Sequence, residues 1–187
     1  MIQAIGIPTG GLAASPAGTV NWDIDGNGSN DFDLGLFVVY SADVFLTNRN
    51  AQVALNDSNN RISKLSAGQA VGTVSDGLGF LGANVALRVV SSGPLLGYNM
   101  DSAWSLGDTG YIGFQFDIGG ATHYGWASMT LSNTAVQYTI NDAWYEDVAG
   151  QAVTVGSTVP EPAHIALGLG ALALGAAGLR RMRQAAA

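Results

Sequence analysis

The chain has 187 residues, which is the size of one large domain or of one domain with an appendage. Only 11% of the residues are charged and 26 are glycine, so the composition excludes a charged disordered chain and a coiled coil. There is no cysteine, which excludes a disulfide scaffold, a thiolate metal site and a cysteine nucleophile.

The charge is distributed unevenly along the chain. Residues 1–159 carry 13 acidic and four basic residues, a balance of −9, whereas residues 160–187 carry one acidic and three basic residues, a balance of +2. An acidic body repels nucleic-acid phosphates and lacks a basic stripe for contacts with them, so we expect no nucleic-acid binding. Divalent cations are the more natural charged partners.

Residues 1–18 are rich in Gly, Pro, Ala and Ser, and they predict a flexible N-terminal extension. This stretch has no basic start and no uninterrupted apolar run, because Pro8, Gly10, Gly11 and Pro16 divide it. It therefore does not have the pattern of a secretory signal peptide.

Residues 19–158 predict one β domain, because short or alternating apolar runs bounded by turn residues recur along it. The predicted strands are 19–24, 32–40, 44–47, 52–55, 85–90, 110–118, 122–131, 135–140 and 152–155. No segment before residue 163 keeps a helical apolar period over a dozen residues. The spacing, with turns such as 57–60 and Gly119-Gly120, favours an antiparallel, jelly-roll-like β-sandwich.

The segment 23–31 carries oxygen side chains at alternate positions. Counted from Asp23, carboxylates stand at positions 1, 3 and 9, an amide at position 5 and Gly28 at position 6. This spacing reproduces the first three quarters of a calcium loop, and Gly28 would supply the positive φ of its bend. The candidate ligands are Asp23, Asp25, Asn27 and Asp31 through their side chains and Ser29 through its backbone carbonyl.

The loop departs from an EF-hand at position 12, where Leu34 replaces the bidentate Glu and a strand follows instead of a helix. It looks more like the strand-loop-strand calcium loops of β-propeller and cell-surface proteins, with Asp33 as an alternative ligand. The other interpretation is a hairpin turn of Asp, Asn and Gly that is solvated without metal. We expect calcium to act as a structural clip and not in catalysis.

The second half of the body contains aromatic motifs, GYIGF from Gly110, HYGWA from His123 and WYE from Trp144. His123 is the only histidine of the body, and no GxSxG pattern marks a nucleophile, so we expect no enzyme. Glu146 and Asp147 are neighbours on a strand and would point to opposite faces, which excludes an acid/base pair across one bond.

Four tryptophans, Trp22, Trp104, Trp126 and Trp144, have two interpretations. They are core or rim aromatics of the sandwich, or they offer stacking faces to the sugars of a polysaccharide. Buried tryptophans favour a structural protein, and exposed coplanar ones favour a binding module.

The C-terminal segment 163–179 has 17 residues without a charge and is followed by Arg180, Arg181 and Arg183. As a helix it would span about 25 Å, at the short edge of what crosses a bilayer. It has no polar face, and the arginines fit the positive-inside rule, so we expect a transmembrane helix rather than an amphipathic or buried one. The apolar anchor residues are Ile165, Leu167, Leu169, Leu172, Leu174 and Leu179.

Val159-Pro160-Glu161-Pro162 precedes this helix, and two prolines flanking a Glu predict an extended, exposed break. VPEP, a short apolar helix and an arginine cluster, in this order, resemble the PEP-CTERM sorting signal of Gram-negative bacteria. The GYIGF, HYGWA and WYE motifs are similar to a body that recurs in many proteins of this class. Residues 159–187 are thus identified as a sorting and anchor segment.

This resemblance implies an exported protein that is held transiently in the inner membrane. An exosortase-type membrane protease would act near the motif, and the protein would reach the cell surface or the extracellular space. Because the first 20 residues carry no signal peptide, we expect one upstream of Met1 rather than a cytoplasmic protein.

Together these patterns predict a structural protein of the cell surface or extracellular matrix. The alternative is a carbohydrate-binding module that holds exopolysaccharide through its tryptophans. An envelope hydrolase is the least favoured of the three hypotheses.

Overall fold

The computed structural model describes residues 1–14, 19–38, 42–48, 52–56, 61–72, 79–80, 86–92, 104–105, 107–133 and 137–158. The contacts of residues 1–157 group them into one compact unit. Within the described ranges the chain is mainly β and contains no helix, which confirms the predicted class. The predicted turn at 57–60 lies outside them.

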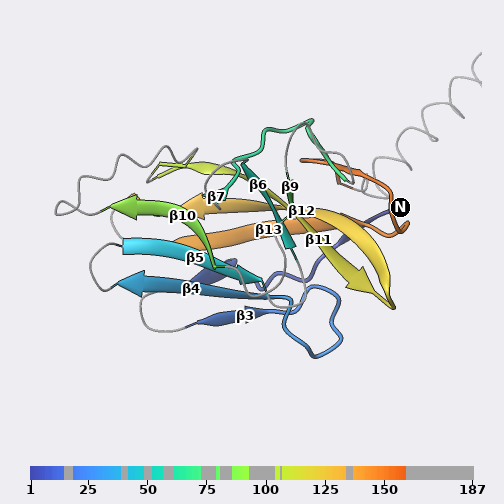
Figure 1. The fold of residues 1–187 in the computed structure, drawn as a ribbon, viewed down its shortest axis with the longest axis horizontal. Helices are drawn as coiled ribbons and strands as arrows, with labels where there is room; N and C mark the ends of the chain where they lie inside the picture. Colours follow the sequence, from blue (N-terminus) through green and yellow to red (C-terminus); the bar gives the residue numbers. More distant parts are fainter. Residues whose placement is uncertain are drawn as a thin grey trace, which may run out of the picture. The chain divides into compact units, whose positions relative to one another are not determined.

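The strands are β1 Ile2–Ala4, β2 Leu12–Ala14, β3 Val20–Trp22, β4 Phe32–Val38, β5 Ala42–Asn48, β6 Gln52–Asn56, β7 Arg61–Ile62, β8 Ala70–Val71, β9 Gly79–Phe80, β10 Ala86–Ser92, β11 Thr109–Ile118, β12 Ala121–Leu131, β13 Tyr138–Glu146 and β14 Val153–Thr154. Twelve of them join in one hydrogen-bonded path, β1-β13-β12-β11-β6-β7-β10-β5-β4-β3, with β2 on β13 and β9 on β6 (Figure 1). The pairs are antiparallel apart from β7 and β10, which meet in parallel at one residue pair. Strands β8 and β14 pair with each other separately.

The longest pairing is the hairpin of β11 and β12, which runs in register from Thr109 opposite Thr130 to Ile118 opposite Ala121. The predicted turn at Gly119 and Gly120 is confirmed, with φ of +60° and +82°. Two successive residues with positive φ are what a tight hairpin turn of the right twist needs, and glycine meets that need without steric cost.

The larger apolar cluster lies between β3 and β4 on one side and β11 to β13 on the other. Trp22, Phe32 and Phe114 meet at its centre, with ring centroids 5.6 to 6.0 Å apart. Ile112, Phe114 and Phe116 alternate along β11 and are at most 2% exposed, as expected for a strand with one face on a core. Each such side chain contributes about 2 kcal/mol through its burial.

A smaller apolar cluster lies on the opposite face of β12. Tyr124 and Trp126 are covered there by residues 65–72 and 151–157, which we call the cover. The cover contributes Leu65, Val71, Val153 and Val155, all buried. Its two segments are joined by the β8–β14 pair, by the Val155 N–H donating to the Gln69 carbonyl at 2.8 Å and by the Gly68 N–H donating to the Val155 carbonyl at 2.9 Å.

Glycines in the aromatic motifs let other groups approach the hairpin closely. A Cβ at Gly125 would collide with the Phe114 ring and lie 2.8 Å from the Trp144 carbonyl oxygen. A Cβ at Gly113 would lie 2.8 Å from a Val71 methyl group of the cover. The glycines of GYIGF and HYGWA therefore serve packing on both faces of the hairpin.

The first 14 residues differ from the predicted flexible extension. Strand β1 pairs with one end of β13, from Ile2 opposite Glu146, and β2 pairs with its other end, from Leu12 opposite Ile140. Ile5 between them is buried. The prediction was wrong for residues 1–14 because β13 supplies the hydrogen bonds that these short segments lack on their own.

The C-terminal predictions fall mostly outside the described residues. Both the sorting motif at 159–162 and the anchor segment at 163–179 with its arginines belong to the part that the structure does not describe. Among the residues it does describe, no helix has the length and apolar character needed to span a membrane.

Candidate metal site

The loop 23–31 connects β3 to β4 and is fixed at both ends. Trp22 stands opposite Phe32 in the β3–β4 register, and the Asp31 N–H donates to the Trp22 carbonyl at 2.9 Å. The loop is also fixed in its middle by Ile24, which is only 6% exposed and belongs to the larger cluster. Gly26 and Gly28 make the bends, with φ of +73° and +86°.

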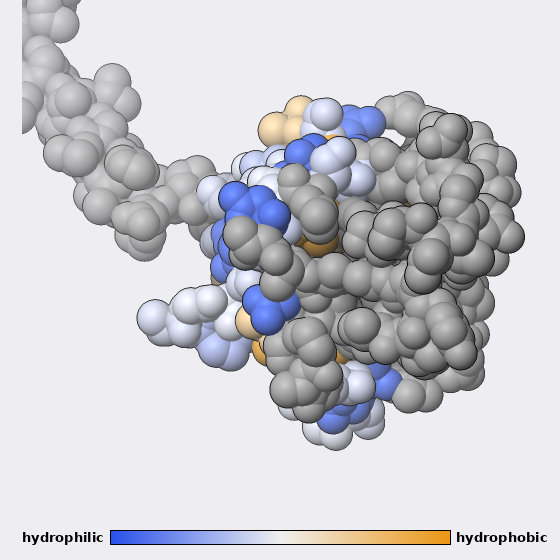
Figure 2. Space-filling model, turned by 90° about the vertical axis from the view of Figure 1, so that its left-hand side faces the viewer, coloured by the Kyte–Doolittle hydropathy of each residue, from blue (hydrophilic) through white to orange (hydrophobic). Residues whose placement is uncertain are grey.

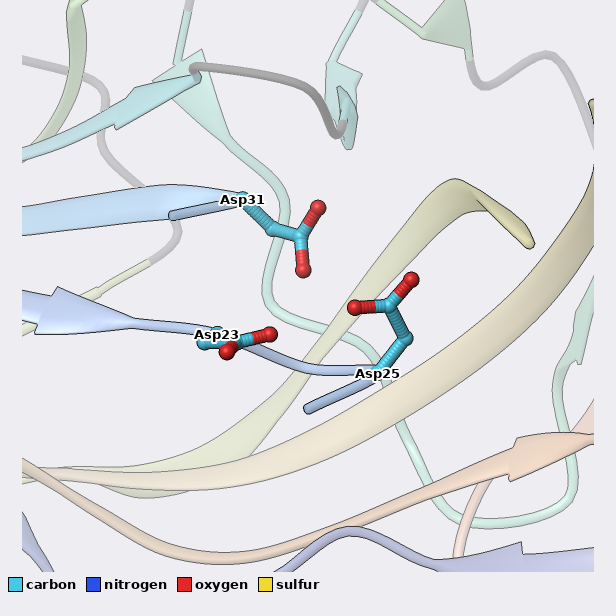
Figure 3. Close-up of side chains that lie close together, drawn as sticks. All are labelled: Asp23, Asp25 and Asp31. Carbon is cyan, nitrogen blue, oxygen red and sulfur yellow. The ribbon is translucent and has the colours of Figure 1, made fainter. Parts of the chain in front are cut away.

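Three carboxylates converge inside this loop. Asp23, Asp25 and Asp31 each offer an oxygen, and these oxygens lie within 4.8 Å of one another (Figure 3). Asp31 is buried and the other two are half-buried. Hard cations such as calcium are bound by such oxygens from alternate residues of a loop.

Backbone N–H groups of the loop orient the carboxylates. Asp23 accepts hydrogen bonds from the N–H groups of Gly26 and Gly28, both at 2.8 Å. Asp31 accepts one from the N–H of Ile24 at 2.8 Å. The fold thus holds the three acids together through bonds that leave further oxygen lone pairs available.

The Asp31 carboxyl is affected both by its burial and by its two acidic neighbours. Burial raises the pKa of the Asp31 carboxyl above its ordinary 3.8, and the negative charges of Asp25 and Asp23 raise it further. The hydrogen bond from Ile24 opposes this rise in pKa by stabilising the ionised form. A cation between the carboxylates would remove both the repulsion and part of the burial penalty.

The predicted ligands are distributed as follows. Asp23, Asp25 and Asp31 come together. Asn27 bonds within the loop, because its Oδ1 accepts the Ser29 N–H at 2.7 Å and its Nδ2 donates to Asp25 at 2.8 Å. Asp33, the alternative ligand, is buried on β4 and does not belong to the described carboxylate group.

Sequence reasoning missed Ile24, which positions the site without being a ligand. Its side chain anchors the loop in the core while its N–H fixes Asp31. An apolar residue between two aspartates in an otherwise polar loop is the signal that would have identified it.

Three of the four tryptophans are buried. Trp22, Trp104 and Trp126 are 2 to 3% exposed, and Trp104 donates its indole N–H to the Ile62 carbonyl at 3.1 Å. Trp144 is half-buried and donates to Asp142 at 2.7 Å. Three of the four therefore lack a free face for a sugar in this conformation.

His123 is packed between strands β11 and β13. It is 7% exposed, its Nδ1 lies 2.9 Å from the Glu146 carbonyl oxygen, and the rings of Phe116 and Tyr145 flank it at 6.0 Å. This environment is that of a strand residue in a core.

The surface can be described only for part of the chain. Among the residues whose side chains the structure describes, Met1 and Val148 are the exposed large hydrophobic ones. On the face drawn in Figure 2, the described residues are mostly hydrophilic or neutral, with small apolar areas between them.

In comparisons with known proteins, no family profile, curated protein or solved structure matches the chain.

Proposed function

We propose that this chain is an exported structural protein of the cell surface or extracellular matrix of a Gram-negative bacterium. In this proposal, a jelly-roll-like β-sandwich body carries one structural calcium ion in the loop 23–31. The observation that supports the calcium site most directly is the convergence of Asp23, Asp25 and Asp31 within 4.8 Å. The role is structural rather than catalytic.

Calcium would act by holding together the carboxylates of the loop that connects β3 to β4. It prefers six to eight oxygen ligands, so Asn27, the Ser29 carbonyl and water would complete what three carboxylates begin. The neutralised loop would then hold Ile24, Trp22 and Phe32 in the larger cluster. Extracellular calcium modules of this kind typically bind at roughly 10⁻⁴ to 10⁻³ M, which suits an exported protein.

The sorting part of the proposal is supported by sequence order alone. VPEP at 159–162, the apolar segment 163–179 and the arginines beyond it follow the end of the compact unit at Ser157. The proposed partners are the inner membrane and an exosortase-type protease. The burial of three tryptophans favours the structural role over an exopolysaccharide-binding module.

The calcium site is tested by thermal unfolding of residues 1–158 with calcium and with chelator. A bound cation stabilises the folded state by mass action, so calcium should raise the midpoint. In the variant Asp23→Ala/Asp25→Ala the midpoint should no longer respond.

The matched control is Asp117→Ala, which removes an exposed carboxylate bonded to Thr122 outside the loop. This variant should keep the full calcium response. If the parent protein shows no response, or the double variant responds as the parent does, the metal site is wrong.

A further inference from the structure

The loop that gathers the carboxylates also contains the chain's only Asn-Gly pair, Asn27-Gly28. Both residues are exposed. An asparagine side chain can be attacked by the backbone nitrogen of the next residue, and a glycine at that place offers no Cβ to hinder the approach. Asparagine is for this reason among the thermolabile residues.

Three hydrogen bonds surround the groups that would react. The attacking group is the Gly28 N–H, which donates to the Asp23 carboxylate at 2.8 Å. The carbonyl to be attacked is Asn27 Oδ1, which accepts the Ser29 N–H at 2.7 Å. The nitrogen that leaves, the side-chain amide Nδ2 of Asn27, donates to Asp25 at 2.8 Å.

Two of these contacts match roles that catalysis of this reaction requires. A general base must lie within hydrogen-bonding reach of the proton it removes, and Asp23 does. A donor at the carbonyl oxygen stabilises the negative charge that develops there, and the Ser29 N–H is such a donor. Asp25 accepts a hydrogen bond from Nδ2, the amide nitrogen that leaves, and so fixes the orientation of the Asn27 side chain.

We propose that Asn27 is a self-modification site, at which the loop converts Asn27 through a cyclic imide into aspartate or isoaspartate. Asp23 takes the Gly28 amide proton while the nitrogen lone pair forms a bond to Asn27 Cγ and the C=O pair moves to Oδ1. Asp23 then passes this proton to Nδ2, the electron pair on Oδ1 forms the C=O bond again, the bond from Cγ to Nδ2 breaks, and Nδ2 leaves as ammonia. No electrons are gained or lost.

Water then opens the imide in one of two ways. Addition at Cγ breaks its bond to the Gly28 nitrogen and yields aspartate at position 27. Addition at the backbone carbonyl carbon of residue 27 breaks its bond to the Gly28 nitrogen and yields isoaspartate, in which the main chain runs through the former side chain. Aspartate at position 27 would add a fourth carboxylate to the proposed calcium loop. This effect on calcium binding rests on the proposed function, whereas the conversion itself does not.

The test follows the mass of the loop peptide over time. The full-length chain is incubated in chelator at neutral pH, digested and analysed by mass spectrometry, beside a synthetic peptide of residues 21–33. We expect the folded chain to convert faster than the peptide and Asp23→Asn to slow the conversion by at least about tenfold. Asn141, which precedes Asp142 on β13, is an internal control and should stay unchanged in the same digest.

Two outcomes overturn the proposal. If the folded chain converts no faster than the peptide, the hydrogen bonds restrain the amide instead of activating it. If Asp23→Asn, shown by circular dichroism to be folded, converts at the parent rate, Asp23 is not the base. The peptide comparison needs no variant and decides even if Asp23→Asn does not fold.

Calcium provides a separate readout, since an ion bound to Asp23 and Asp25 should slow the conversion of the parent chain. A conversion that calcium leaves unchanged, while the difference between folded chain and peptide persists, supports self-modification and counts against the calcium site.

Discussion

The carboxylate of Asp31 accepts the backbone N–H of Ile24 at 2.8 Å, and both residues are buried. One hydrogen bond thus links the residue before β4 to the apolar residue that anchors the loop. It also places a negative charge at the edge of the larger cluster, beside two further carboxylates. The stability of the body should therefore depend on the charge of this one group.

The first prediction concerns pH in the absence of metal. The pKa of Asp31 is raised above 3.8, chiefly by burial. An acid whose pKa is higher in the folded state binds its proton more tightly there, and this stabilises the folded protein. The stabilisation is complete when the pH is below the ordinary pKa, and it is lost as the pH rises through the raised pKa. In chelator, the free energy of unfolding of the parent minus that of Asp31→Asn should therefore fall as the pH rises from below 3.8 through the raised pKa.

Denaturant unfolding of both proteins over a pH series measures this difference, in which titrating groups that do not interact with Asp31 cancel. Saturating calcium should reverse the trend, because a cation favours the ionised carboxylate. A difference that stays constant across the series would contradict the assigned role of Asp31.

The second prediction tests packing at Gly125. Gly125→Ala introduces a Cβ against the Phe114 ring and the Trp144 carbonyl, so it should lower the free energy of unfolding by about 1–3 kcal/mol or more. Gly6→Ala is the control, because a Cβ at Gly6 meets nothing within 4 Å. Equal stability of the two variants in denaturant would show that the hairpin accommodates the added methyl group.

The third prediction concerns the cover. Val153→Ala removes methyl groups that are 1% exposed and should destabilise the body by about 2 kcal/mol. Thr154→Ala changes the exposed neighbour on the same strand and should cost much less. Tryptophan fluorescence during unfolding reports the effect, since Trp126 lies beneath the cover. A loss at Thr154 as large as that at Val153 would mean that strand pairing, and not burial, holds the cover.

The fourth prediction concerns the tail. If residues 163–179 insert in the membrane, changing Arg180, Arg181 and Arg183 to Glu should weaken retention in that orientation. Deleting residues 163–187 should release a soluble, folded body, because the described pairing and turn bonds end by Ser157. Fractionation of the chain with an added signal peptide, in hosts with and without the sorting protease, measures both. Finding the full-length chain only in the soluble fraction of the host without the protease would contradict the anchor.

Local patterns explain which parts of the fold the sequence predicts. Strands β4, β11 and β12 were found from their apolar runs, and the turn at Gly119-Gly120 from its glycines, because these signals lie within the element itself. The convergence of Asp23, Asp25 and Asp31 is likewise a property of one short loop.

Signals that depend on distant partners were missed. Strands β1 and β2 have three residues each and exist because β13 offers them hydrogen bonds. The strand at 152–155 was predicted from its own alternation, but its pairing with the segment at Val71, far away in sequence, was not. The burial of the tryptophans could not be decided either, because it depends on which strand faces are covered by other parts of the chain.

The position of β14 in the chain determines when the body can be completed. During synthesis or transport from the N-terminus, the cover on β12 stays incomplete until residues 153–155 emerge and pair with the segment near Val71. Contacts between such distant residues form late, because the long intervening loop must be closed first. The shielding of Tyr124 and Trp126 from water is therefore completed only as the chain immediately before Val159 arrives.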